Sequence, residues 1–354
     1  MSRSPRNSRI VASVAVVAAG LFLSLTQCPP AQGDGAFEID GWSELVLSVS
    51  DLQRHARFYR EIAGWEQRAA GPLDAQALAG WCLDPEMPGR QALFGNPGTV
   101  RGFVRLVRFE AASQVQIRSN AQAWEAGGIL DFNVRVPDME RKFTQMQADG
   151  WLAHSDPLQF RFGPFVVNEW IAVGPDGASL ALIERVEPPL EGWPQLRDFS
   201  RTFNSTQVVK DFEAARSFYQ DVLGFREYLS HEGPSPAPGE NVLGLPWEVA
   251  ASSPRRVWIG SPAGDNEGSV ELLAFDGLSG RHFGERAVPP NLGMLMLRFP
   301  IRGIDAFAEH LAKHGVEPVC GIHAVDFEPH GPARQLSIRA PDGAWLDFYE
   351  TARD

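Results

Sequence analysis

Two carboxylates in the second half of the chain stand in the middle of otherwise apolar segments. Glu271 is centred in Ser-Val-Glu-Leu-Leu-Ala-Phe, and Asp347 in Ala-Trp-Leu-Asp-Phe-Tyr-Glu. In a strand, successive side chains point to opposite faces, so each carboxylate would face away from its apolar neighbours. A buried charge is costly unless it is paired. Each carboxylate then faces either solvent or a cleft that needs its charge, and we expect the cleft, where they bind a cation or move a proton.

A histidine close in sequence to the second carboxylate is a candidate for the same chemistry. His330 lies near Arg334 and Asp347. A neutral imidazole there could act as a base or as a fourth metal ligand. The alternative, a solvated or structural loop histidine, stays open, because most histidines on loops have no chemical role.

The chain also contains an internal repeat. Residues 43–65 and 204–225 each contain an alternating strand, an Asp, an amphipathic helix with a Phe-Tyr pair, and a closing Gly. Asp51 and Asp211 are expected to cap the two helices. Weaker copies occupy residues 128–151 and 293–316. Four similar units mean that the chain is built from modules, which must be recognised before any site is assigned.

Each unit continues into further strands. Apolar, β-branched segments follow each helix, and the second and fourth units end with a Pro-Asp-Gly turn and a last strand, at residues 174–184 and 340–350. The fold class is therefore α+β, with four βαβββ modules. We expect the first module to pair with the second and the third with the fourth.

This succession resembles the vicinal oxygen chelate superfamily, which includes glyoxalase I, bleomycin-resistance proteins and extradiol dioxygenases. The resemblance covers roughly residues 40–352. It implies two cupped, mostly antiparallel barrels, each made of two modules. The implied domains are residues 40–187 and 201–352, with a proline-rich linker at 188–200.

In this superfamily a divalent metal lies in each cup, held by side chains from the first and late strands of the modules. In the first half the matching positions are Glu44, Arg105, Asp131 and Ala181. A guanidinium is always protonated and has no lone pair for a metal. We therefore expect Arg105 to bridge Glu44 and Asp131 in place of a metal.

In the second half the matching positions are Asn204, Glu271, Met296 and Asp347. Asn204, Glu271 and Asp347 offer oxygen ligands, which implies a divalent metal such as Mn, Mg, Zn or Fe. The thioether of Met296 is a soft ligand that suits copper(I) instead. Leu295 or Leu297 would face the cup if the strand register slipped by one. The superfamily's His-His-Glu iron site is absent from these positions.

The first residues resemble an export signal. Three arginines precede an uncharged run at residues 10–25, followed by Cys28, two prolines and a small-residue site that ends at Gly33. This layout predicts a signal peptide over residues 1–33 and a periplasmic or extracellular protein. A lipoprotein signal ending at Cys28 is the alternative, and would anchor the chain by lipid. Contact with a membrane is expected only through such a signal or anchor.

The charge of the chain argues against nucleic acid as a partner. The formal net charge is −12, and removing residues 1–33 would take away three arginines and no acid, leaving −15. An acidic surface repels phosphate backbones. Outside the signal only Cys82 and Cys320 remain. Two buried thiols are the expectation for them, and a bridge in an oxidising compartment is the alternative.

Two functions fit these observations, and both have a small molecule as partner. The first is a glyoxalase- or dioxygenase-like enzyme, a lyase or isomerase, in which a metal polarises the substrate while Glu271 or His330 moves a proton. The second is a bleomycin-resistance-like protein that binds a small molecule without chemistry. The sequence carries no signal of oligomeric state.

Overall fold

The computed structural model describes residues 36–111 and 113–352 of the chain. The signal peptide predicted for residues 1–33, and its alternative lipid-anchor site at Cys28, lie outside these residues. No helix within the two described ranges is long and apolar enough to cross a membrane.

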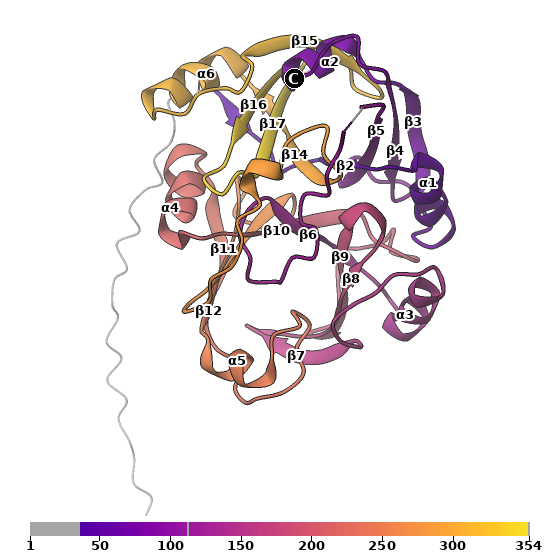
Figure 1. Cartoon of the computed structure of the whole chain (residues 1–354), viewed down its shortest axis with the longest axis vertical. Helices are drawn as coiled ribbons and strands as arrows, with labels where there is room; N and C mark the ends of the chain where they lie inside the picture. Colours follow the sequence, from indigo (N-terminus) through magenta and orange to yellow (C-terminus); the bar gives the residue numbers. More distant parts are fainter. Residues whose placement is uncertain (1–35, 112, 353–354) are drawn as a thin grey trace, which may run out of the picture. The chain divides into compact units, whose positions relative to one another are not determined.

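The strands form two mixed sheets, which Figure 1 shows by colour: indigo strands lie beside yellow ones in one sheet, and magenta beside orange in the other. In spatial order the first sheet contains β15 (Ile322–Phe327), β16 (Gly331–Arg339), β17 (Trp345–Thr351), β14 (Gly293–Arg302), β2 (Glu44–Ser48), β5 (Phe103–Phe109), β4 (Gly89–Gly95) and β3 (Glu66–Pro72), with the short β1 (Glu38–Ile39) beside β14. The second sheet contains β11 (Arg226–Gly233), β12 (Arg255–Ser261), β13 (Ser269–Phe275), β10 (Thr202–Val208), β6 (Ile129–Arg135), β9 (Ser179–Glu187), β8 (Phe165–Val173) and β7 (Leu158–Phe162).

The predicted fold class is confirmed, but the pairing of the modules differs from the expectation. The first module pairs with the fourth, because β2 runs antiparallel to β14 with Glu44 opposite Arg298. The second pairs with the third through β6 and β10, with Asp131 opposite Thr206. The pairing of consecutive modules was therefore wrong. Residues 40–187 and 201–352 each contribute one module to each sheet.

The helices begin as the sequence predicts. The Asp51 carboxylate accepts hydrogen bonds from the backbone N–H groups of Gln53 and Arg54, and Asp211 accepts one from Ala214. Both aspartates are therefore N-caps, as expected. The helices are α1 (Leu52–Glu61), α2 (Ala75–Gly80), α3 (Met139–Ala148), α4 (Phe212–Ser217) with a π-helical turn at Phe218–Val222, α5 (Trp247–Ser252) and α6 (Ile304–Lys313), and short 3₁₀ turns lie at Pro175–Gly177 and Gly284–Arg286.

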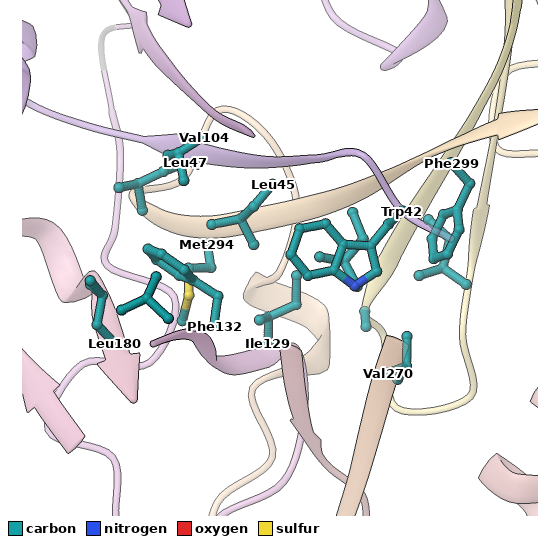
Figure 2. Packing of buried hydrophobic residues seen from close by; sticks show 14 of the residues in the cluster. Trp42, Leu45, Leu47, Val104, Ile129, Phe132, Leu180, Val270, Met294 and Phe299 are labelled. Carbon is teal, nitrogen blue, oxygen red and sulfur yellow. The ribbon is translucent and has the colours of Figure 1, made fainter. Parts of the chain in front are cut away.

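One hydrophobic core joins the two sheets. Leu45 and Val104 of the first sheet pack in the same cluster as Phe132, Leu180 and Val270 of the second (Figure 2). The four long helices add their apolar faces to it, including the buried Phe-Tyr pairs of α1 and of the helix that begins with α4. The opposite faces of the sheets are therefore left for other contacts, and the functional candidates lie there.

The two Pro-Asp-Gly turns connect modules that do not share a sheet. The carboxylate of Asp176 accepts hydrogen bonds from the backbone and hydroxyl of Ser50, at 2.9 and 2.8 Å, and lies 3.0 Å from Nε2 of the buried His55. Asp342 accepts from the backbone of Lys210 at 2.9 Å and lies 3.1 Å from His282. Each turn thus binds the junction between strand and helix in the preceding module. Consecutive modules therefore contact each other through these turns and not through paired strands.

A disulfide joins the first and fourth modules. Cys82 follows α2 and Cys320 precedes β15, and their Cα atoms are 5.8 Å apart. The expectation of two separate buried thiols was wrong. The sequence could not show this contact, because 238 residues separate the two positions and the module pairing that brings them together was itself unexpected.

Reducing this disulfide should destabilise the protein by about 2–4 kcal/mol, because the cross-link restricts the unfolded chain. Urea unfolding with and without dithiothreitol measures the difference. The double variant Cys82→Ser, Cys320→Ser is the matched control. Its free energy of unfolding should equal that of the reduced wild type and should not change with dithiothreitol. A wild type that ignores the reductant as well would contradict the disulfide.

Candidate functional site

The faces of the two sheets that point away from the shared core carry most of the predicted site residues. We call the face of the first sheet that carries Glu44 and Arg105 the first cup. The face of the second sheet that carries Asp131 and Glu271 is the second cup. The two cups differ in what occupies them.

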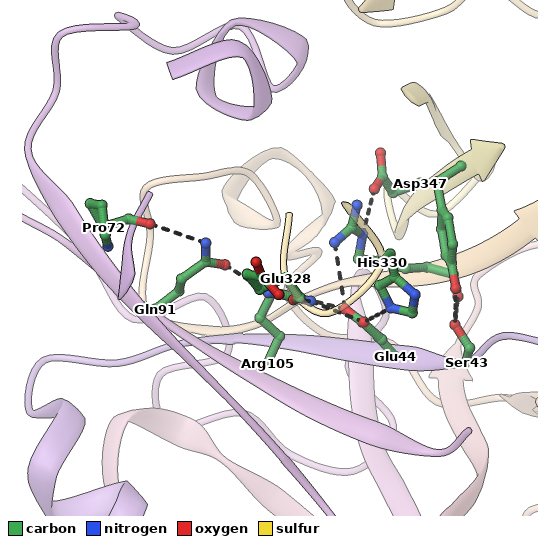
Figure 3. A network of polar contacts seen from close by, with 10 residues as sticks. Ser43, Glu44, Pro72, Gln91, Arg105, Glu328, His330 and Asp347 are labelled. Carbon is green, nitrogen blue, oxygen red and sulfur yellow. Dashed lines mark hydrogen bonds and ion pairs between the residues drawn. The ribbon is translucent and has the colours of Figure 1, made fainter. Parts of the chain in front are cut away.

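Buried ion pairs fill the first cup (Figure 3). Arg105 on β5 donates two hydrogen bonds to the Glu44 carboxylate on β2, from Nε to Oε2 at 2.8 Å and from Nη2 to Oε1 at 3.0 Å. Its remaining donors reach the side-chain oxygen of Gln91 and the backbone carbonyl of Glu328, both at 2.8 Å. Arg105 is therefore held on several sides by residues of the first and fourth modules.

A second arginine extends this network to the fourth module. Nε of Arg298, on β14, donates to the Asp347 carboxylate at 2.7 Å, and Nη1 lies 3.5 Å from Glu44. Ser337 donates to the other Asp347 oxygen at 2.6 Å, and Nε2 of His330 lies 2.6 Å from Glu44. The acids and both guanidinium groups are buried. Together they form a charge-compensated row across the seam between β2 and β14.

The pKa of Glu44 shows that this row keeps the carboxyl group ionised. Burial by itself would raise the pKa of the Glu44 carboxyl, but Arg105, His330 and Arg298 outweigh burial and hold it well below its usual value. Two guanidinium groups already neutralise the carboxylates of the first cup. A metal ion does not fit there, because it would have to displace a charged side chain with no other buried partner.

The structure corrects the residue sets expected for both halves. The ion pair between Arg105 and Glu44 is confirmed, but Asp131 lies in the other sheet, so Arg105 does not bridge the two acids. Asp347 also belongs to the first cup, apart from Asn204 and Glu271. The expected set of metal ligands is therefore split between two sheets.

Met296 and His330 also belong to the first cup. Met296 packs with Val46, Trp81 and Trp345, and Arg298, two residues further on, takes the position between the two acids. His330 touches Glu44, so it cannot share a reaction centre with Glu271 in the second sheet. Arg298 was missed, although a single arginine in an apolar strand is the same signal that singled out Glu271.

The second cup contains a cavity of about 730 Å³, within the range of small-molecule sites. Its walls are mostly apolar and aromatic, and the loop between β11 and α5 borders it. Apolar lining residues include Phe160, Phe162, Phe165, Val167, Ile171, Ile183, Phe203, Leu229, Leu243, Val257, Ile259 and Leu273.

Four carboxyl groups line this cavity, three from its strands and one, the exposed Glu240, from the loop between β11 and α5. Asp131 on β6 and Glu271 on β13 flank Thr206 of β10 in the strand register, and Glu169 projects from β8. Burial raises the pKa of Asp131 to about 7. Burial, reinforced by the neighbouring acids, raises the pKa of Glu169 and of Glu271 to about 8. The cavity therefore holds carboxyl groups that exchange protons near neutral pH.

The remaining polar groups of the second cup do not complete a metal site. The side-chain oxygen of Asn204 accepts a hydrogen bond from Asn133 at 2.8 Å, and its amide donates to Ser269 at 2.8 Å. Ala181 has no donor atom. Across the described residues, no three His, Cys, Asp or Glu side chains come close enough to hold a metal ion together. The donor set of this chain therefore does not fit the metal that the resemblance implied.

The cavity-facing orientation predicted for Glu271 is confirmed, since Val270 and Leu272 pack in the core while Glu271 lines the cavity. Asn204 and Asp131 join it there, although they were assigned to different halves. Glu169 was missed. It stands in Phe-Val-Val-Asn-Glu-Trp-Ile-Ala-Val, so the rule that found Glu271 would also have found it.

Comparison with known proteins agrees with this geometry. Residues 202–348 match the model of the Glyoxalase/Bleomycin resistance protein/Dioxygenase superfamily. The matched segment, which is less than half of the chain, is therefore similar to this superfamily. The matched residues run from β10 to β17, so they take in the third and fourth modules. None of the curated protein sequences matches the chain.

Solved structures show a similar fold over most of the chain. Glyoxalase I from Zea mays is 15% identical, with a TM-score of 0.59 over 89% of this chain and 93% of the maize chain. A "putative dioxygenase" from Bacillus subtilis is 12% identical, with a TM-score of 0.55 over 89% and 86%. An Mn(II)-bound glyoxalase from Novosphingobium aromaticivorans is 12% identical, with a TM-score of 0.30 over 89% and 83%. At these identities the first two establish the fold alone.

Replacing Glu44 with Gln should destabilise the protein by about 3–5 kcal/mol at pH 7, because Arg105 and Arg298 would lose a buried counter-charge. A folded-state pKa below the unfolded value of about 4.3 gives stability that is present above pH 4.3 and lost as the pH falls through the folded value. The difference in the free energy of unfolding between the wild type and Glu44→Gln should therefore become smaller in acid.

Urea unfolding from pH 3 to pH 7 measures the effect of Glu44→Gln. Glu38→Gln is the matched control, because Glu38 pairs with Arg302 at an exposed site, where an ion pair contributes less than about 1 kcal/mol. If both variants lost the same small amount of unfolding free energy, the buried ion pairs would contribute no more than an exposed pair, which would contradict the prediction.

Replacing Glu271 with Gln should stabilise the protein at alkaline pH, whereas Glu44→Gln should destabilise it. The folded carboxyl keeps its proton up to pH of about 8, whereas the unfolded one ionises at about 4.3, so folding must take up a proton between these values. Wild-type stability should therefore fall as the pH rises from 4 to 8. The variant should be more stable than the wild type at pH 8, by at least about 1 kcal/mol, and equal to it near pH 4.

The free energy of unfolding across this pH range tests the prediction for Glu271→Gln. Glu248→Gln, at an exposed position on α5, is the control and should follow the wild type. A Glu271→Gln variant that is less stable than the wild type at every pH would contradict the assignment.

Proposed function

We propose that the chain is an exported superfamily enzyme that binds a small, largely apolar molecule in the second cup and moves a proton on it. One observation carries the proposal: carboxyl groups from three strands, those of Asp131, Glu169 and Glu271, line a largely apolar cavity of about 730 Å³. Such a cavity binds the body of a small molecule by burial, while a few convergent polar groups fix its orientation. The first cup, filled by its own ion pairs, contributes stability.

Glu271 is the residue to which we assign the proton transfer. A pKa of about 8 gives it both protonation states near neutral pH, which suits a general acid or base. Burial is the main cause of this high pKa, and Asp131 and Glu169 add to it through their negative charge. A proton taken from the substrate by Glu271 and returned at another atom is an isomerisation, and one that accompanies loss of a leaving group is a lyase reaction.

A divalent metal is not part of this proposal. Mn, Mg, Zn or Fe would need several converging ligands, and the second cup offers Asn204 with its oxygen already hydrogen-bonded and Ala181 with none. We expect manganese, magnesium and zinc salts to leave the melting temperature of the protein unchanged, since a bound ion would raise it. One equivalent of metal retained on purification, and lost in Glu271→Ala, would contradict this.

The absence of a fitting metal site among the described residues favours a second candidate, the capture of a small molecule without chemistry. The same cavity would then serve as a binding site, and Glu271 as an orienting group. The two candidates share the ligand and differ in turnover.

Export is part of the proposal. It is supported by the signal-like layout of residues 1–33 and by the disulfide between Cys82 and Cys320, because disulfides persist mainly in oxidising compartments. The mature protein would then meet its small molecule outside the cytoplasm.

Filling the second cup should abolish ligand binding. Ala181 lines the cavity, so Ala181→Leu should remove the thermal stabilisation given by any ligand found in a small-molecule screen. Ala70→Leu is the control, because Ala70 lines a smaller cavity of about 420 Å³ beside Arg105. Loss of binding in the control alone would move the site to the first cup.

Turnover separates the two candidates. Diketones, thioesters and catechols that bind should be converted by the wild type, and Glu271→Gln should lower kcat about 10²–10⁴-fold, the usual contribution of a general acid or base. Ligands that bind tightly and are recovered unchanged would favour capture.

A further inference from the structure

The two cups carry the same row of strand positions with one difference. In the first cup Arg298 of β14 lies in register with Glu44 of β2 on one side and Asp347 of β17 on the other. In the second cup Thr206 of β10 lies in register with Asp131 of β6 and Glu271 of β13. Both rows are acid, central residue, acid. Only the first has a cation at its centre.

The missing cation leaves the acids of the second cup without a close ionic partner. Burial raises the pKa of Asp131 and of Glu169, and it outweighs the charges of Arg118 and Arg135, which lower these pKa values from beyond ion-pair distance. Within the described residues, neither Asp131, Glu271 nor Glu169 forms an ion pair. Asp131 is 2% exposed, lines the cavity, and its Oδ1 has no hydrogen-bond partner among those residues. A buried carboxyl oxygen that faces an open cavity points to a ligand that donates to it.

Four arginines line the same cavity, and none of them forms an ion pair with its strand acids among the described residues. Arg161 lies 3.8 Å from Glu187, and Arg255 donates a hydrogen bond to Ser235 at 3.0 Å. Arg135 stands four residues beyond Asp131 on β6, about 13 Å along the strand, and its guanidinium lies 4.4 Å from the ring centre of Phe203. Arg185 lies 3.8 Å from the ring centre of Phe165. Both guanidinium groups rest on aromatic faces, so the end of the cavity around Thr206 remains acidic.

We propose that the second cup binds an organic cation, an amine or guanidine on an apolar body, whose charged group takes the place between Asp131 and Glu271 that Arg298 fills in the first cup. This inference rests on the proposed function, since it names the chemical class of the ligand of the same cavity. The apolar walls receive the body of the ligand. The acids supply the counter-charge and accept its N–H donors.

Three indole probes of matched size test the charge. Tryptamine is cationic, indole-3-ethanol neutral and indole-3-propionate anionic. Isothermal titration of the wild type at pH 7.5 should give tryptamine at least a 10-fold lower Kd than either of the others. Equal or tighter binding of the neutral or anionic probe would overturn the proposal and leave the small-molecule site standing. No binding by any probe, together with no stabilising compound in the wider screen, would overturn both.

Two variants locate the charged group. Asp131→Asn should weaken tryptamine at least 10-fold and indole-3-ethanol less than about 3-fold, and the exposed Glu248→Gln should change neither. Thr206→Arg should place a guanidinium between the acids, as in the first cup, and abolish tryptamine binding. Because the probe series on the wild type needs no variant, the proposal can fail even if a variant does not fold. Full tryptamine affinity in a folded Thr206→Arg protein would overturn it.

Discussion

The structure depends on how each sheet neutralises the acids at its central seam. Where two modules meet, two carboxylates face the same side and flank one residue of the neighbouring strand. Arg298 between Glu44 and Asp347 closes the first cup with ion pairs, and Arg105 adds a second guanidinium. Thr206 between Asp131 and Glu271 leaves the second cup open and acidic. One cup is thus committed to stability, while the other keeps the unpaired groups that function requires.

The arrangement of the modules explains why the first cup serves to stabilise the fold. The first and fourth modules lie at opposite ends of the chain, so closing their sheet carries the cost of a long loop. The buried row, the disulfide between Cys82 and Cys320 and the core shared by both sheets offset this cost. The Pro-Asp-Gly turns then hold consecutive modules together through Asp176 and Asp342. Among its described residues, the second sheet has no such buried row at its centre, and the cavity lies on its face.

The sequence predicted the local structure well and the long-range structure poorly. The N-caps Asp51 and Asp211, the strand alternation around Glu271 and the four modules follow from short-range patterns, and all were confirmed. The pairing of the modules depends on contacts between distant strands, about which periodicity says nothing. That single error separated Glu44 from Asp347 and Asn204 from Asp131. Arg298 and Glu169 carried a readable signal, a lone charge in an apolar strand, and a uniform use of that rule would have found them.

The central claim, that the second cup holds Asp131 and Glu271 with no cation between them, is tested most directly by carboxyl ¹³C NMR of the ligand-free protein across pH. The account predicts Asp and Glu carboxyl signals that titrate near pH 7–8, identified by their loss in Asp131→Asn and Glu271→Gln. Tryptamine should shift these titrations to lower pH. If every carboxyl in the wild type titrates below about pH 5, as unperturbed groups do, the second cup already contains its counter-charge and the account is wrong.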